Sequence, residues 1–197
     1  QVTTLVEPDL PLYYWPSRVH DGAKLADYGF FLTQAKRIVI DTAIENASVP
    51  EFSWPRPDSL RDMAYARILQ IRQSLGQFLS TYDPTTLVDG LEAVELTADP
   101  ALAAEAGFVL EWTLDNLAAC RDQEEETVVP SKARFDGSSG SIGMRWIYGD
   151  RKAFSWEVDL SSGRARIDAT MQGEPIHRSS IVRLLGTEQA LGEALFF

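Results

Sequence analysis

The chain has 197 residues, of which 45% are hydrophobic and 24% are charged, and its formal net charge is −11. This composition is typical of a globular protein with a conventional core, and it excludes a disordered or low-complexity chain. Residues 1–130 hold 21 acidic and 9 basic residues, so we expect this part of the surface to repel nucleic acid and anionic lipid, and we expect no such partner.

The single cysteine, Cys120, excludes an internal disulfide and a zinc site built on several cysteines. No apolar run reaches the roughly 18 residues of a membrane span, and no signal peptide is present. We therefore expect a cytoplasmic protein. The length fits one domain over residues 1–197, and because the chain begins with Gln1 we expect a piece of a longer protein.

The first predicted elements alternate between strand and helix. Pro11 stands in the apolar segment 10–15, which predicts a short strand that begins near Leu12 or lies at a sheet edge. Asp21 caps a predicted helix over 21–36. Residues 37–43, RIVIDTA, then form an apolar β-branched run, which predicts a fully buried strand.

A continuous apolar stripe predicts a helix over 59–80, with Ser59 and Asp62 as its capping box. Residues 91–97 predict a strand. Asp99 then gives the N-cap of a helix that runs to about Cys120. Strands covered by helices are the expected arrangement of the first two thirds of the chain.

The last third changes to a period of two. Residues 142–148, 153–159 and 164–171 predict short strands with one apolar and one polar face, separated by turn signals. Thr187 caps a final amphipathic helix. The fold class is therefore mixed α/β, with a helix-covered sheet in the first two thirds, followed by an antiparallel β-meander and a C-terminal helix.

No catalytic or metal-binding pattern emerges from the sequence. The only histidines, His20 and His177, lie outside any recognisable motif. The glycine- and serine-rich segment 136–143 predicts a turn before a strand, and the acidic segment 121–127 a solvated loop rather than a metal site. Cys120 is most simply a small buried residue. We expect no catalytic residue, no cofactor and no metal.

Two groups of residues are candidates for binding. Most of the five tryptophans occupy apolar positions of predicted elements, but Trp54 lies in a proline-rich connection and is a candidate sugar platform. Arg164 and Arg166 belong to a basic set in the meander that can bind phosphate or an acidic protein surface. Solvated strand faces are the simpler interpretation of these arginines.

Three segments, taken in order, resemble motifs of the OpcA family: PDLPLYYW at 8–15, KRIVIDTA at 36–43 and DMAYARILQIRQSL at 62–75. Two later segments, 91–114 and 184–195, resemble the strand–helix pair and the C-terminal helix of that family. The family is described as the glucose-6-phosphate dehydrogenase assembly protein or subunit. The resemblance covers nearly all of the chain.

This resemblance implies a non-enzymatic subunit that binds glucose-6-phosphate dehydrogenase, aids its active oligomer and activates it allosterically in the oxidative pentose phosphate pathway. Asp41 and Arg67 are candidates for a buried or interfacial ion pair, because a charge beside an apolar strand needs a partner. The motif-matched residues are Asp9, Pro11, Trp15, Arg37, Asp41, Asp62, Tyr65, Arg67 and Arg72.

The chain also departs from the family pattern. Tyr14 and Tyr65 stand where tryptophan is usual, and the domain that usually precedes the first motif is absent, so we expect the C-terminal portion of such a protein. A lone cysteine gives no basis for the redox control proposed for the family. Two alternatives stay open: a module that binds sugar or sugar phosphate through Trp54 and the meander arginines, and a hydrolase that uses scattered carboxylates.

Overall fold

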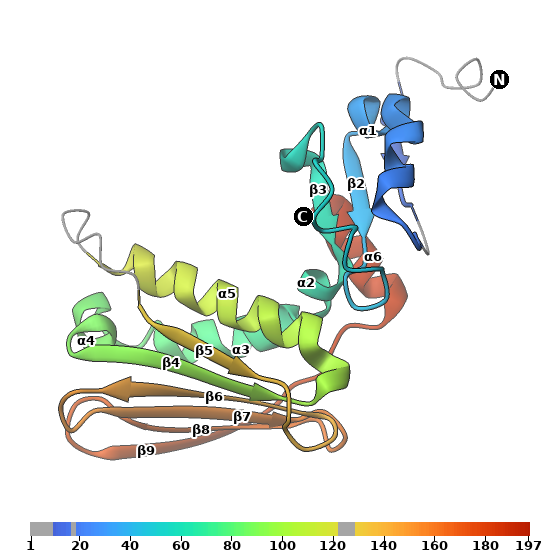
Figure 1. Cartoon of the computed structure of the whole chain (residues 1–197). Coiled ribbons are helices and arrows are strands. Elements are labelled where there is room, and N and C mark those ends of the chain that lie inside the picture. Colours follow the sequence, from blue (N-terminus) through green and yellow to red (C-terminus); the bar gives the residue numbers. More distant parts are fainter. Residues whose placement is uncertain (1–9, 17–18, 122–128) are drawn as a thin grey trace. The chain divides into compact units, whose positions relative to one another are not determined.

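The computed structural model describes residues 10–16, 19–121 and 129–197 (Figure 1). The chain divides into two compact units. The first comprises Gln1–Arg67 together with Leu185–Phe197, and the second comprises Ile68–Leu184. The second unit is thus an insertion in the sequence of the first, and we describe each unit by itself.

The described part of the first unit contains a three-stranded parallel sheet with the order β1-β2-β3. The strands are β1 (Tyr13–Tyr14), β2 (Arg37–Ile40) and β3 (Leu60–Asp62). The central strand β2 buries Ile38 and Val39 completely, which confirms the predicted buried strand. The strand after Pro11 begins at Tyr13 and lies at the sheet edge, so both positions that the proline allows are met.

The predicted helix over 21–36 is present as two pieces, the 3₁₀-helix η2 (Gly22–Tyr28) and the α-helix α1 (Gly29–Gln34). Asp21 is the N-cap, as expected, and its side chain accepts a hydrogen bond from the backbone N–H of Ala23 at 3.0 Å. The break falls at Gly29, a residue of low helix propensity. The helix therefore changes type at its weakest position.

The prediction of one helix over 59–80 is wrong at its start. Pro57–Ser59 forms the 3₁₀-helix η3, and the next three residues are β3 rather than a helical turn. They pair in parallel with β2, and hydrogen bonds to a neighbouring strand outweigh a local helical pattern. The helical part is α2 (Met63–Arg67) followed by α3 (Leu69–Leu79).

The C-terminal helix α6 (Thr187–Phe196) completes the first unit. Its N-cap is Gly186, so the prediction that Thr187 caps it is wrong by one residue, and no side chain bonds to the cap. Ala190 and Ala194 of this helix pack against Met63, Ala66 and Val39. Small residues on the helix allow this close approach to α2 and β2.

The described part of the second unit contains a six-stranded sheet with the order β5-β4-β6-β7-β8-β9, antiparallel except where β4 pairs with β5. The predicted strand at 91–97 and the three meander strands are confirmed. The strands β5 and β9 were not predicted, because neither buries an alternate apolar face. The bounds are β4 Leu91–Ala98, β5 Ser131–Arg134, β6 Ser141–Tyr148, β7 Ala153–Asp159, β8 Arg164–Thr170 and β9 Pro175–Ile181.

Helices α3 and α5 (Ala103–Ala119) lie on one face of this sheet (Figure 1). The core of the unit lies between these helices and the sheet, and it includes the fully buried Ile71, Leu75, Trp146 and Trp156. Ahead of α5, Asp99 caps the short 3₁₀-helix η4 (Pro100–Leu102), which confirms the predicted cap.

The short helix α4 (Pro84–Val88) precedes β4. Before β6, the glycine- and serine-rich segment forms the predicted turn. Most of the acidic segment 121–127 lies outside the described residues. Within the described ranges, no helix is both long enough and apolar enough to cross a membrane.

Candidate functional site

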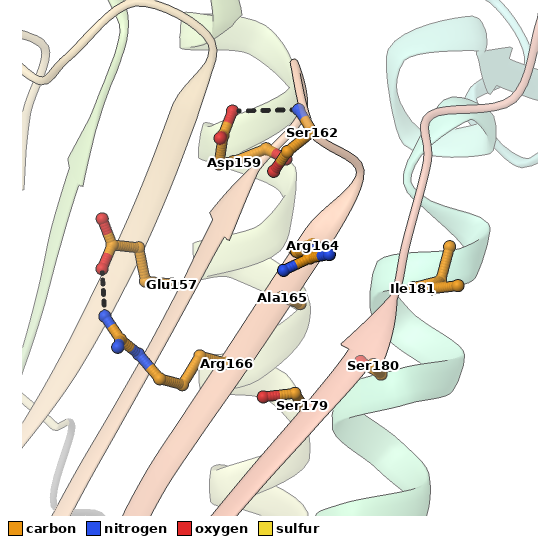
Figure 2. A pocket seen from close by; sticks show the side chains of 9 residues that line it. All are labelled: Glu157, Asp159, Ser162, Arg164, Ala165, Arg166, Ser179, Ser180 and Ile181. Atoms are coloured by element: carbon orange, nitrogen blue, oxygen red, sulfur yellow. Dashed lines mark hydrogen bonds and ion pairs between the residues drawn. The ribbon is translucent and has the colours of Figure 1, made fainter.

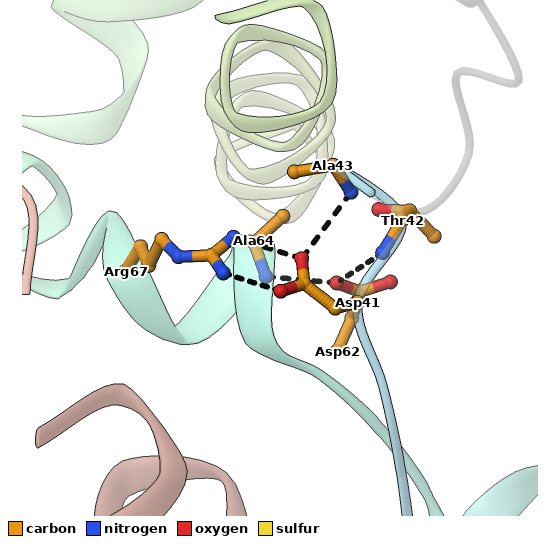
Figure 3. Close-up of polar contacts among 6 residues, drawn as sticks. All are labelled: Asp41, Thr42, Ala43, Asp62, Ala64 and Arg67. Atoms are coloured by element: carbon orange, nitrogen blue, oxygen red, sulfur yellow. Dashed lines mark hydrogen bonds and ion pairs between the residues drawn. The ribbon is translucent and has the colours of Figure 1, made fainter. Parts of the chain in front are cut away.

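Two carboxylates lie at the ends of neighbouring parallel strands in the first unit. Asp41 directly follows β2, and Asp62 is the last residue of β3, where it is paired in register with Ile40. Because the strands are parallel, their carboxyl ends meet at one edge of the sheet, which is where ligands and functional groups gather in such sheets. We call Asp41, Asp62 and Arg67 the strand-end cluster (Figure 3).

Arg67, the last residue of α2, forms a bidentate ion pair with Asp41. Its Nη1 donates to Oδ1 of Asp41 at 2.8 Å, and its Nη2 donates to Oδ2. Asp41 is only 2% exposed, and Oδ1 also accepts a hydrogen bond from the backbone N–H of Ala43 at 3.3 Å. The expected charge pair between two motif segments is therefore present, and it is buried.

Asp62 sits beside this pair and caps α2. Its Oδ1 accepts hydrogen bonds from the backbone N–H groups of Ala64 at 2.8 Å and Thr42 at 3.4 Å. Burial raises the pKa of Asp62 to about 6, and the charge of Asp41 adds to the increase, although the hydrogen bonds act in the opposite direction. Asp62 therefore changes its charge near neutral pH.

The strand-end cluster is better suited to holding the fold than to metal chemistry. Both oxygens of Asp41 are committed to Arg67. Among the residues that the structure describes, no group of three or more histidine, cysteine, aspartate or glutamate side chains is placed to hold a metal ion. What the cluster can do is fix the start of α2 against the ends of β2 and β3, and exchange one proton at Asp62.

Two motif-matched aromatic residues lie at the surface close in sequence to these strand ends. Trp15, directly after β1, is 40% exposed, and Tyr65 on α2 is 36% exposed. Tyr14, Trp15 and Tyr28 help to line a pocket of about 360 Å³. Tyr28 on η2 is 47% exposed and Phe30 on α1 is 41% exposed, so further aromatic side chains lie at the surface of this unit.

The remaining motif-matched residues are not drawn into the strand-end cluster. Arg37 is the first residue of β2, so it lies at the amino ends of the parallel strands, whereas the strand-end cluster lies at their carboxyl ends. Arg72 is half-buried on α3 in the second unit. Trp54 is half-buried, packs against the apolar core of the first unit, and meets Phe52 edge-on at 5.1 Å between ring centroids. Asp9 lies outside the described residues.

Arg164 and Arg166 lie on β8, on the sheet face opposite α3 and α5, which we call the outer face (Figure 2). They line a pocket of about 610 Å³ together with Glu157 and Asp159. Nη2 of Arg166 is 3.6 Å from a carboxylate oxygen of Glu157, and its Nε is 3.6 Å from one of Asp168. The arginines are exposed, as expected of a solvated strand face, and Arg166 is already near two carboxylates.

Charge alternates across the outer face from strand to strand. Glu95 on β4 lies between Lys132 on β5 and Arg145 on β6. Arg145 donates a hydrogen bond to Glu95 at 2.7 Å, and this contact, more than any other, lowers the pKa of Glu95. Since opposite charges face each other along the rows, the outer face is not a uniformly basic surface.

No protein-family model and no curated protein sequence matches this chain. The resemblance to the OpcA motifs is therefore a prediction. The contacts that join the motif segments and the surface residues next to them are the observations on which a function can be argued.

Proposed function

We propose that this chain is a regulatory subunit, similar to members of the OpcA family, that binds glucose-6-phosphate dehydrogenase in the cytoplasm and activates it without catalysing a reaction of its own. One observation carries the proposal. Asp41 of the RIVIDTA segment and Arg67 of the DMAYAR segment, 26 positions apart, form a buried bidentate ion pair. Two of the three segments that suggest the family thus meet in one contact.

A buried ion pair is a poor source of stability, because the cost of desolvating both charges offsets their attraction. Its best-attested use is to fix a specific geometry. Here the pair holds α2, and with it Tyr65, at the carboxyl edge of the parallel sheet. We infer that Asp41, Asp62 and Arg67 anchor this edge, whereas Trp15 and Tyr65 present exposed rings to the dehydrogenase.

Exposed tryptophan and tyrosine are the residue types that most often dominate the energy of a protein–protein contact. Each ring is large and rigid, so it buries much surface while it loses little conformational freedom on binding. Trp15 directly follows β1 and Tyr65 lies on the helix that follows β3, so both belong to segments that leave the same edge of the sheet. This supports a docking surface at that edge.

A module that binds sugar phosphate is the second candidate. The outer-face pocket of about 610 Å³ offers the guanidinium groups of Arg164 and Arg166 and the hydroxyl of Ser179. Guanidinium groups bind phosphate well. Glu157 and Asp159 line the same pocket and would repel a phosphate dianion, and Trp54 belongs to the other compact unit. We therefore favour the regulatory subunit.

Binding measurements with three variants test the proposal. The dehydrogenase of the same genome is mixed with the wild-type chain, Trp15→Ala, Tyr65→Ala, or Phe135→Ala, and each mixture is analysed by size exclusion and by titration. Phe135 is a matched control, because it is 42% exposed but lies in the second unit. We expect a complex with the wild type and the control, and a loss of about 30-fold in affinity for each of the other two variants.

Calorimetry with glucose 6-phosphate separates the two candidates. Saturable binding of the sugar phosphate to the chain alone, lost in Arg166→Ala, would favour the binding module. Absence of any complex with the dehydrogenase would contradict the regulatory subunit. If all three variants bind the dehydrogenase as tightly as the wild type does, the regulatory role would stand, but the docking surface at the strand ends would be refuted.

A further inference from the structure

Strand β9 (Pro175–Ile181) is an open edge of the six-stranded sheet. It pairs with β8 on one side, and no described strand pairs with it on the other. All seven of its residues are exposed, and its register with β8 runs without a bulge. The other edge strand, β5, has only four residues and carries Lys132 and Arg134. A short, charged strand is how proteins protect a sheet edge, and the longer β9 is less protected.

The hydrogen-bond pattern shows which backbone groups of this edge are free. The N–H of Val182 donates to the carbonyl of Gly163 at 3.0 Å, so these two residues form a hydrogen-bonded pair at the end of the β8–β9 ladder. Such pairs recur at every second residue, so the even-numbered residues of β9 bond to β8. The N–H and C=O groups of His177, Ser179 and Ile181 therefore point away from β8, toward the open edge.

The free donors are limited at both ends of the strand. Pro175 has no N–H group, and the N–H of Arg183 donates to a glutamine side chain of α3 at 3.0 Å. The segment whose outward N–H and C=O groups are both free is therefore 177–181, and its middle residue is Ser179. A second copy of this segment, antiparallel to the first and related to it by a two-fold axis at Ser179, brings each free donor opposite a free acceptor.

The side chains agree with this register. On the outer face, Ser179 (Figure 2) lies opposite Ser179 of the second copy, and on the face toward α3, Arg178 lies opposite Ser180. A register centred on Arg178 would set two arginines directly opposite each other, and like charges so placed are destabilising. It would also set Pro175, which has no N–H group, opposite Ile181. The register centred on Ser179 avoids both faults.

We propose that two copies of this chain associate through β9, paired antiparallel about Ser179, so that their six-stranded sheets become one continuous sheet. The partner is a second copy because the free segment matches its own reverse in length, in hydrogen-bonding groups and in the placement of Arg178. The assembly closes at two copies, since it uses both open edges and leaves only the protected β5 edges. Pairing of one strand buries little surface, so the dimer is weak and reversible. This association is independent of the proposed binding to the dehydrogenase.

Sedimentation equilibrium of the whole chain, from about 1 µM to about 1 mM, tests the association. We expect a monomer–dimer equilibrium for the wild type. Ser179→Pro removes an outward N–H in each copy but no bond to β8, so the dimer should weaken by at least about tenfold. Ser131→Pro is the matched control, because it makes the same substitution at the first residue of the other edge strand, and it should dimerise as the wild type does.

Cysteine cross-linking tests the register, and it also serves if Ser179→Pro does not fold. In a Cys120→Ala background, Ser179→Cys places the two thiols opposite each other, at a Cα separation of about 5.5 Å that a disulfide accepts. Ser180→Cys is the matched control, because its two copies are offset along the strands and lie about 8 Å apart, beyond the reach of a disulfide. On mild oxidation, we expect a covalent dimer from Ser179→Cys but not from Ser180→Cys.

A wild-type chain that stays monomeric up to about 1 mM would overturn the proposal, and the open edge would then be free for a strand of another protein. A dimer that Ser179→Pro forms as tightly as the wild type does would also overturn it. So would covalent dimers formed in equal yield by Ser179→Cys and Ser180→Cys, because random collision rather than a fixed register would then explain them.

Discussion

The charge state of Asp62 makes the stability of the protein depend on pH in a defined direction. Burial raises the pKa of this carboxyl group from its ordinary 3.8 to about 6, so the folded state holds the proton more tightly than the unfolded chain does. The resulting stabilisation is fully present below about pH 4 and is lost as the pH rises through 6. At pH 5 it amounts to about 1.4 kcal/mol, and at pH 8 almost none is left.

Asp62→Asn removes this dependence and keeps the geometry. The amide oxygen can still accept the hydrogen bonds from the backbone N–H groups of Ala64 and Thr42, but the side chain carries no charge at any pH. The variant should therefore be more stable than the wild type at pH 8, by up to about 3 kcal/mol, and the difference should be smaller at pH 5 by about 1.4 kcal/mol.

Urea unfolding at pH 5 and pH 8, followed by tryptophan fluorescence, measures both free energies of unfolding. Asp27→Asn is the control, because it makes the same substitution at an exposed position on η2 in the same unit. A variant Asp62→Asn that is less stable than the wild type by the same amount at both pH values would refute the reasoning, since the side chain would then act only through its shape and hydrogen bonds.

Four further predictions concern other parts of the chain as well as the strand-end cluster. Arg67→Met should lower the free energy of unfolding by about 3–5 kcal/mol, because it leaves Asp41 buried without its partner, and adding Asp41→Leu should restore part of that loss; equal losses in the single and double variants in urea titrations would contradict this. Gly137→Ala should destabilise by about 1–3 kcal/mol, because its Cβ would lie 2.8 Å from the backbone carbonyl carbon of Ala98; an unchanged melting temperature would contradict it. If the outer face borders the dehydrogenase contact, Arg166→Glu should change the association rate and its salt dependence in stopped-flow binding; an unchanged rate would exclude that face. The expectation that residues 1–197 form one domain predicts that both compact units unfold together in a single calorimetric transition; two separate transitions would contradict it.

The sequence was most informative where burial left a clear apolar pattern. Ile38 and Val39 of β2, and Phe154 and Trp156 of β7, are buried as their spacing predicts. The pattern failed at Leu60–Asp62, which continues a helical stripe in the sequence but pairs with β2 instead. Whether a neighbouring strand is available for pairing depends on residues distant in sequence, so the local period carries no signal of it.

The candidate site was predictable in part. A charge beside an apolar strand needs a partner, and the resemblance to the OpcA motifs made Arg67 the candidate partner of Asp41. The position of Asp62 beside that pair could not be predicted, because it depends on the register that sets Asp62 opposite Ile40.

The most direct test of the proposed function is the activity of the dehydrogenase of the same genome as a function of glucose 6-phosphate concentration, with and without this chain. We expect a lower apparent KM in its presence, together with elution of the enzyme in a larger complex. Unchanged kinetics and unchanged elution at saturating amounts of the chain would contradict the regulatory role.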